Sequence, residues 1–166
     1  IFSEFYTFNP SYKDGYATWL GVSSLPKFNY KSDSLKEVLI SEHDSIIRKW
    51  LREPFNMDGW RVDVANMSGR QGDVDFTHDV ARITRHAMED EGEDKLLIAE
   101  HFHDAGPDLD GDGWHGSMNY AAFMKPVWNW LVNKDYDGKW LGLPFKVPSF
   151  SGLNMFNSIK SFSSRM

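Results

Sequence analysis

Three charged residues in the sequence occupy positions where a charge is costly unless it is paired and useful. Arg61 and Asp63 alternate with apolar residues at the period of a β-strand, so both should point to one face of it. Glu100 directly follows a short, continuous apolar run, which is typical of a strand buried in a parallel sheet. These residues are therefore the first candidates for chemistry.

The surroundings of the two carboxyl groups favour opposite protonation states. The guanidinium of Arg61 should keep Asp63 ionised, as a nucleophile requires, and the apolar run before Glu100 should keep that residue protonated, as a general acid requires. Glycosidic bond cleavage needs such a pair, because one group attacks the sugar and the other protonates the leaving oxygen. Spacing alone leaves open an interior salt bridge for Arg61 and Asp63, and a helix-cap neighbour for Glu100.

The elements that must position these residues follow from apolar periodicity. Helices are predicted at 34–52, about 75–91, 126–132 and around 153–162, and strands at 60–65, 96–99 and 117–120. Ser34 and Glu37 match a capping box at the first helix. Residues 1–32 are interpreted as ordered loop, and 133–150 as a loop rich in Gly and Pro. Strands that alternate with helices predict an α/β fold with a parallel sheet, and three strands cannot close a barrel.

Composition narrows the class of protein. The 166 residues are 41% hydrophobic and 25% charged, which is typical of a globular chain. The net charge of −6 argues against nucleic acid or an anionic membrane as a partner. The absence of Cys excludes disulfides and thiolate metal sites, and no apolar run is long enough to span a membrane. Because the chain begins at Ile1, we expect a segment of a longer protein. The absence of Cys fits a reducing compartment, and we expect a cytoplasmic location.

Four motifs, in order along the chain, resemble those of one enzyme family. Asp58–Asn66 resembles the nucleophile strand of the α-amylase family, glycoside hydrolase family 13, and Leu97–His103 resembles its acid/base strand. Leu25–Asn29 and Met118–Tyr120 are similar to motifs of the branch that holds neopullulanases, cyclomaltodextrinases, maltogenic amylases and maltodextrin glucosidase-like enzymes. The resemblance covers roughly residues 5–166.

The resemblance implies a TIM (β/α)8 barrel with a small domain inserted after its third strand. By this analogy, residues 1–32 end the inserted domain, and residues 33–166 form a partial barrel, strands four to six with their helices. Asp63 would be the nucleophile on strand four and Glu100 the acid/base on strand five. The implied activity is retaining hydrolysis of maltodextrins, cyclodextrins or related α-glucans. The family's third catalytic Asp lies on strand seven, outside this chain, so this segment alone should be inactive.

The resemblance also implies supporting residues. Arg61 would orient Asp63, and the substrate-binding residues would be Asn66, Phe102, His103, Asn119 and Tyr120. Most of these have a structural alternative: a helix cap for Asn66, a loop histidine bonded to backbone for His103, and plain packing for the two aromatic rings.

An acidic loop raises the question of calcium. Asp108, Asp110 and Asp112 copy the first half of a calcium-binding loop, but its twelfth position is Asn119 in place of a bidentate Glu. An acidic, turn-rich loop near the substrate cleft is the alternative. No other metal site and no cofactor are predicted.

Several functions remain open at this point. A transglycosylase would use the same residues as a hydrolase, and a non-catalytic glucan-binding relative would keep both carboxylates without turnover. A magnesium-dependent barrel enzyme is a further class, against which the neighbouring Arg61 argues. Expected partners are an α-glucan oligosaccharide, the remainder of the same enzyme and a second copy of the full-length protein, since members of this branch often dimerise.

Overall fold

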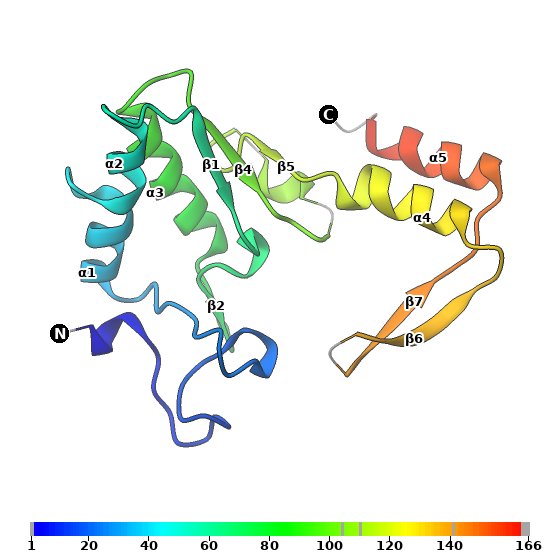
Figure 1. The fold of residues 1–166 in the computed structure, drawn as a ribbon, viewed down its shortest axis with the longest axis horizontal. Coiled ribbons are helices and arrows are strands. Elements are labelled where there is room, and N and C mark those ends of the chain that lie inside the picture. The colour runs from blue at the N-terminus through cyan, green and yellow to red at the C-terminus, as the bar shows by residue number, and fades with distance from the viewer. Residues whose placement is uncertain (1, 104, 110, 141, 164–166) are drawn as a thin grey trace. The chain divides into compact units, whose positions relative to one another are not determined.

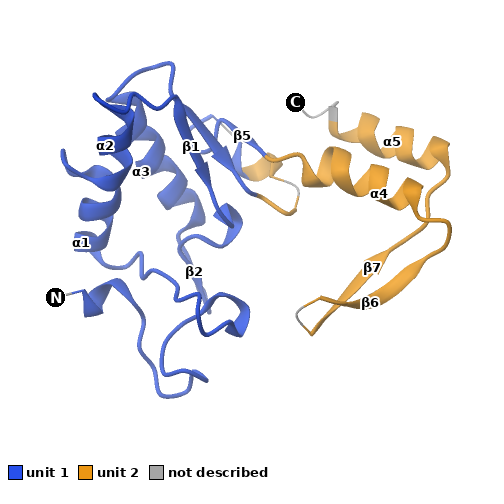
Figure 2. Cartoon of the chain, in the orientation of Figure 1, with its two compact units in different colours: residues 1–100, 108–117 blue, residues 101–107, 118–166 orange. Residues whose placement is uncertain are grey.

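The computed structural model describes residues 2–103, 105–109, 111–140 and 142–163. The chain divides into two compact units, which are described separately (Figure 2). The first unit holds residues 1–100 and 108–117, and the second holds residues 101–107 and 118–166. None of the described helices has the length and the apolar composition that crossing a membrane requires.

A three-stranded parallel sheet is the centre of the first unit. Its strands are β1 (Gly59–Val62), β4 (Leu96–Ala99) and β5 (Gly116–Ser117), in the order β1-β4-β5. The predicted strands are thus confirmed, although the third begins one residue earlier and ends at Ser117. Gly59 is needed for the pairing, because a Cβ at this position would overlap the carbonyl oxygen of Leu96.

Helices cover one side of this sheet (Figure 1). They are α1 (Asp33–Lys36), a π-helical turn (Glu37–Ser41), α2 (Ile46–Leu51) and α3 (Thr77–Glu89). The single helix expected over 34–52 is wrong, because Ser45 starts a new helix: its hydroxyl accepts from the Arg48 N–H at 3.4 Å and donates to the Ile40 carbonyl at 2.7 Å. The first helix is capped by Ser32, which accepts from the Leu35 N–H, and not by the predicted Ser34.

The core of the first unit lies between the sheet and these helices. Leu97 and Ala99 of β4 are completely buried, as are Ala81 and Met88 of α3. Trp114, which precedes β5, is 1% exposed and belongs to the same cluster. The central strand is therefore fixed by packing on the helical side and by hydrogen bonds along both edges.

The N-terminal segment of the first unit is mostly irregular, as predicted. It holds two 3-10 turns, Ser3–Phe5 and Trp19–Gly21, and isolated bridges such as Tyr6 to Phe28. A small hairpin, which the sequence did not indicate, follows β1 and a 3-10 turn (Ala65–Met67). It consists of β2 (Arg70–Gln71) and β3 (Val74–Asp75).

The second unit is built from two helices and a hairpin. A π-helical turn (Tyr120–Met124) leads into α4 (Lys125–Leu131), and α5 (Gly152–Ser163) follows the antiparallel strands β6 (Tyr136–Trp140) and β7 (Leu143–Val147). Both predicted helices are confirmed, and the loop predicted at 133–150 is corrected to this hairpin. A further 3-10 turn spans Gly106–Asp108.

Candidate active site

The two candidate carboxylates follow directly on paired strand ends. Val62 ends β1 and Ala99 ends β4, and these residues are partners in the parallel register. The Glu100 N–H donates to the Val62 carbonyl at 2.9 Å, and the Ala65 N–H donates to the Glu100 carbonyl at 3.0 Å. Asp63 and Glu100 therefore lie beside each other at the carboxyl edge of the sheet, where barrel enzymes hold their reacting groups.

One guanidinium contacts both carboxylates. Arg61 donates through one terminal nitrogen to Oδ1 of Asp63, and its other terminal nitrogen lies 2.9 Å from Oε1 of Glu100. The predicted shared face of Arg61 and Asp63 is thus confirmed. The alternative of a plain interior salt bridge is wrong, because the side chains of Arg61 and Asp63 are 42% and 76% exposed.

The residue after Asp63 adopts a backbone conformation that is rare for a β-branched side chain. Val64 has φ 46° and ψ 41°, and its N–H donates to Oε2 of Glu100 at 2.9 Å. Such strained residues cluster at functional sites. This role was not predicted, because Val62 and Val64 fit one alternating strand that runs to Ala65, whereas the strand ends at Val62.

The two carboxylates differ in their surroundings. The Glu100 side chain is 21% exposed, and each of its oxygens has a partner, Arg61 on one side and the Val64 N–H on the other. Asp63 projects into solvent with a single carboxylate oxygen held by Arg61. The arrangement holds an enclosed carboxyl group next to an accessible one, as the sequence led us to expect.

The predicted residue Asn66 also lies in the first unit, as does Trp60 of β1. Trp60 packs against the core and donates its indole N–H to the Ile47 carbonyl at 3.1 Å, so it is not a sugar platform. Asn66 is 9% exposed in the turn after Val64. No helix-cap hydrogen bond from a side chain is found at this turn, so a cap does not account for Asn66.

The remaining predicted residues lie in the second unit. The Phe102 ring is 41% exposed, and its centroid lies 5.3 Å from that of Tyr120 and 6.1 Å from that of His103. The predicted Asn119 is exposed and accepts the Met124 N–H through its backbone carbonyl at 3.0 Å. Phe102, Tyr120 and His103 thus form one aromatic cluster.

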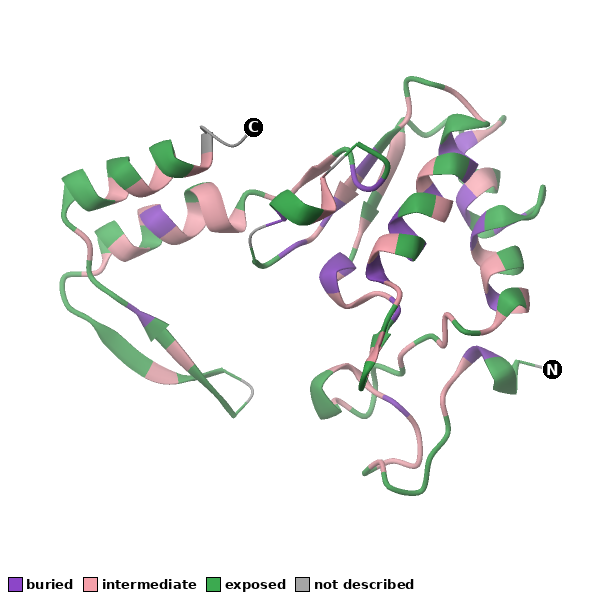
Figure 3. Ribbon diagram, turned by 180° about the vertical axis from the view of Figure 1, so that it is seen from behind, coloured by how far each residue is buried: buried purple, intermediate pink, exposed green. Residues whose placement is uncertain are grey.

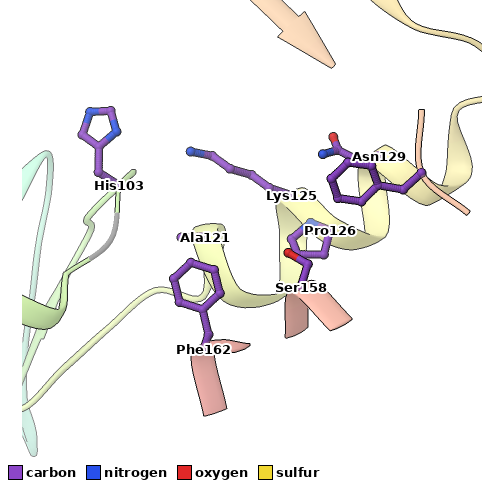
Figure 4. Close-up of a pocket in the computed structure, with 8 residues that line it drawn as sticks. His103, Ala121, Lys125, Pro126, Asn129, Ser158 and Phe162 are labelled. Atoms are coloured by element: carbon purple, nitrogen blue, oxygen red, sulfur yellow. The ribbon is translucent and has the colours of Figure 1, made fainter. Parts of the chain in front are cut away.

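Lys125 supports this cluster and was missed by the sequence analysis. Its ammonium donates to the Phe102 carbonyl at 2.8 Å and lies 4.3 Å from the centroid of the Phe102 ring. Burial lowers the pKa of Lys125. Lys125 and His103 also line a cavity of about 330 Å³ beside Asn129 (Figure 4). Lys125 begins α4 directly after the π-helical turn, which the sequence analysis did not predict.

The possible calcium loop is only partly described, because Asp110 lies outside the described residues. Oδ1 of Asp112 is 3.0 Å from Nε2 of His78, and this contact occupies one of its carboxylate oxygens. Among the described residues, no three or more acidic, His or Cys side chains gather as metal ligands would. Calcium at this loop stays a prediction.

Comparison with known proteins identifies the family. Residues 4–138 match the family model of the alpha amylase catalytic domain. The chain belongs to the α-amylase family. This confirms the resemblance that the four motifs indicated, and with it the partial TIM barrel, of which the β1-β4-β5 sheet is the described part.

Relatives in the α-amylase family are much longer than this chain. An intracellular maltogenic amylase of Bacillus subtilis is 28% identical over 150 residues, which cover 90% of this chain and 23% of the relative. A maltogenic alpha-amylase of Bacillus acidopullulyticus is 34% identical over 127 residues, 76% of this chain and 19% of the relative. The chain thus spans about a quarter of the length of the first of these relatives.

Solved structures share the fold. A cyclic alpha-maltosyl-(1-->6)-maltose hydrolase from Arthrobacter globiformis superposes with a TM-score of 0.70 and 19% identity, over 99% of this chain and 32% of that one. A type III pullulan hydrolase from Thermococcus kodakarensis gives a TM-score of 0.66 and 21% identity, over 98% of this chain and 24% of that one.

Proposed function

We propose that the enzyme carrying this chain is a retaining α-glucoside hydrolase with Asp63 as nucleophile and Glu100 as acid/base. The observation that carries this proposal is the contact of one guanidinium, that of Arg61, with both carboxylates at adjacent strand ends. Retaining glycosidases hold their two carboxyl groups about 5–5.5 Å apart. A guanidinium that contacts both Asp63 and Glu100 supports such a close pair.

Each residue has a defined task in the first step. Asp63 is the accessible carboxylate, so its free oxygen attacks the anomeric carbon. Glu100 gives its proton to the glycosidic oxygen as the bond between that oxygen and the anomeric carbon breaks. Arg61 orients Asp63, because its guanidinium donates a hydrogen bond to the attacking carboxylate.

The second step reverses these roles. Glu100, now ionised, takes a proton from water, and the water oxygen attacks the anomeric carbon and displaces Asp63. The Val64 N–H and Arg61 both contact the Glu100 carboxyl group and keep it in place through both steps. Two inversions at one carbon leave the product with the configuration of the substrate.

The names of relatives support the substrate class. The similar proteins include maltogenic amylases and a cyclomaltodextrinase of Geobacillus thermopakistaniensis, which is 33% identical over 108 residues. We therefore propose short α-glucans, namely maltodextrins or cyclodextrins, as substrates. The name of the Bacillus subtilis relative includes the word intracellular, which supports a cytoplasmic location. Homodimerisation of the full-length protein stays a prediction.

Two alternatives give different outcomes in the same assay. A transglycosylase would pass the glucosyl group to a sugar, so its products from maltotriose would include longer chains. A non-catalytic binder would hold maltotriose without releasing any product. A magnesium enzyme is disfavoured because the Arg61 cation already contacts both carboxylates that would have to bind the metal.

Substitution of each carboxylate in the complete enzyme tests the assignment. Asp63→Asn should lower kcat on maltotriose by about 10³-fold or more while the Kd for maltotriose changes little. Glu100→Gln should impair maltotriose far more than an activated aryl α-glucoside, because a good leaving group needs no proton.

Asp58→Asn is the matched control, since Asp58 is an exposed carboxylate just before β1. It should keep normal turnover. Near-normal turnover of Asp63→Asn would refute the nucleophile assignment, and equal losses of Glu100→Gln on both substrates would refute the acid role.

A further inference from the structure

A second cavity lies in the first unit, between the N-terminal segment and the β2–β3 hairpin. Its volume is about 250 Å³, below the range of about 300–1,000 Å³ that drug-sized ligands need. Its walls include Tyr12, Phe28 and Tyr30 from the N-terminal segment and Gln71 and Phe76 from the hairpin region. Figure 1 shows β2 beside the loops of the N-terminal segment. A cavity of this size has room for one ring-sized ligand.

The two walls are tied together by specific contacts. Gln71 donates from Nε2 to the Tyr12 hydroxyl at 3.0 Å, and Lys27 donates from its ammonium to the Arg70 carbonyl. The hairpin itself is closed by the ion pair of Arg70 with Asp75 at 2.6 Å. A side-chain hydrogen bond from Arg70 lowers the pKa of Asp75 to about 2, so this pair is charged at neutral pH. The pocket is therefore preformed, because these contacts hold its two walls together without a ligand.

The lining has the composition that neutral sugars prefer. The Phe28 ring lies 5.7 Å from that of Tyr6 and 6.4 Å from that of Tyr30. It is still 43% exposed, so its exposed part can contact the C–H groups of a sugar. The Gln71 amide oxygen accepts no hydrogen bond from the other described residues and can take one from a hydroxyl. Burial raises the pKa of Tyr30 to about 12, so its phenol stays neutral.

We propose that this pocket binds one glucose unit of an α-glucan at a distance from the bond that is cut. The proposal rests on the proposed function and adds a binding position to it. The hairpin that forms one wall begins at Arg70, a single 3-10 turn after Asp63, so both lie on the same loop of the first unit. On this proposal, a long glucan contacts the pocket and the carboxylates together, whereas a short one contacts only the carboxylates.

Kinetics on substrates of two lengths test the pocket in the complete enzyme. Phe28→Ala should raise the KM for maltoheptaose about tenfold, the equivalent of about 1.4 kcal/mol, and leave an aryl α-glucoside unchanged. Tyr12→Phe, which removes only the hydroxyl that Gln71 binds, should give a smaller change of the same pattern. Lys13→Ala, an exposed residue of the same segment that does not line the pocket, is the control. Equal losses on both substrates, or no loss on either, would overturn the proposal.

Hydrogen exchange gives a second readout that does not depend on a pocket variant folding. In the Asp63→Asn enzyme, which should bind without cutting, maltoheptaose is expected to slow amide exchange at residues 69–76 more than maltose does. Unchanged exchange there with saturating maltoheptaose would contradict the pocket. If the unaltered enzyme cleaves no α-glucan at all, the proposed function fails, while this exchange experiment still decides whether the pocket binds one.

Discussion

The two units of the chain bury their apolar side chains to very different extents. The first unit encloses a continuous cluster around β4 and α3, in which several residues have no exposed surface. Large apolar side chains on α4 and α5 of the second unit are exposed instead (Figure 3). They are Trp128 (43%), Trp130 (47%), Leu131 (68%), Leu153 (68%) and Phe156 (59%).

This contrast matches the division of the site residues between the units. Asp63 and Glu100 extend directly from strands whose neighbours, Leu97 and Ala99, are completely buried. Phe102 and Tyr120 lie on the less buried unit and are held by contacts among a few side chains. Bond cleavage requires carboxylates fixed within about 0.5 Å, whereas a stacking ring tolerates more movement. The unit with the more completely buried core therefore carries the proposed chemistry.

The largest expected effect comes from the same substitution, Leu to Ala, made once in each unit. Leu97→Ala, at a completely buried position, should lower the free energy of unfolding by about 3 kcal/mol, because it removes buried methyl groups and leaves a cavity. Leu131→Ala, at a position 68% exposed, should change it by less than about 0.5 kcal/mol. Urea denaturation measures both. Similar losses for the two variants would mean that the burial contrast does not describe the folded enzyme.

The next largest effect concerns the stability contributed by the ion-pair cluster of Glu91 with Arg48 and Arg52. Glu91, two residues after the end of α3, is 9% exposed in its side chain and accepts hydrogen bonds from Arg48 at 2.9 Å and Arg52 at 2.5 Å. Glu91→Gln should destabilise the first unit by about 2 kcal/mol, because the two guanidinium groups lose their shared anion. Glu93→Gln, two residues on and exposed, serves as the control and should be neutral.

The same cluster predicts how stability depends on pH. The hydrogen bond from Arg52 lowers the pKa of Glu91 below its usual value of 4.5, with the Arg48 bond adding to this. The stabilisation is therefore present above that value and is lost as pH falls through the lowered pKa of the folded state. Below about pH 4.5, the free energy of unfolding should fall as the pH decreases. This fall should be less steep in Glu91→Gln than in the unaltered enzyme. An unchanged slope would show that Glu91 does not carry this dependence.

The smallest effect concerns the second unit. Lys125→Met keeps the length of the side chain but removes the charge over the Phe102 ring, so the KM for maltotriose should rise about two- to threefold with kcat unchanged. Lys134→Met, at an exposed position outside this cluster, should leave both constants unchanged. A large fall in kcat for Lys125→Met would mean that the second unit contributes to bond cleavage and not only to binding.

The sequence predicted the parallel sheet and the carboxylate pair because their signals are local. The alternation through Arg61 and Asp63 and the apolar run before Glu100 each mark a strand, and parallel strand ends meet at one edge. Helix α3 was predicted within two residues at each end, because its apolar stripe is continuous.

The missed features depend on contacts that periodicity does not encode. The hairpin β6–β7 contains Gly138 and Pro144, which disfavour strands. Its two strands nevertheless pair without a break from Tyr136–Val147 to Trp140–Leu143. The strands β2 and β3 have two residues each, too few to show a period. The left-handed backbone of Val64 is imposed by its hydrogen bond to Glu100, a residue far along the chain.

Trapping the glycosyl-enzyme tests the central claim most directly. A fluorinated glucosyl fluoride, which forms the covalent intermediate readily and releases it slowly, would be incubated with the complete enzyme before peptide mass spectrometry. We predict one fluoroglucosyl group on the peptide that holds Asp63, attached at this residue and absent from the Asp63→Asn enzyme. A label on Glu100 or on any other residue, or steady turnover without a covalent adduct, would contradict the account.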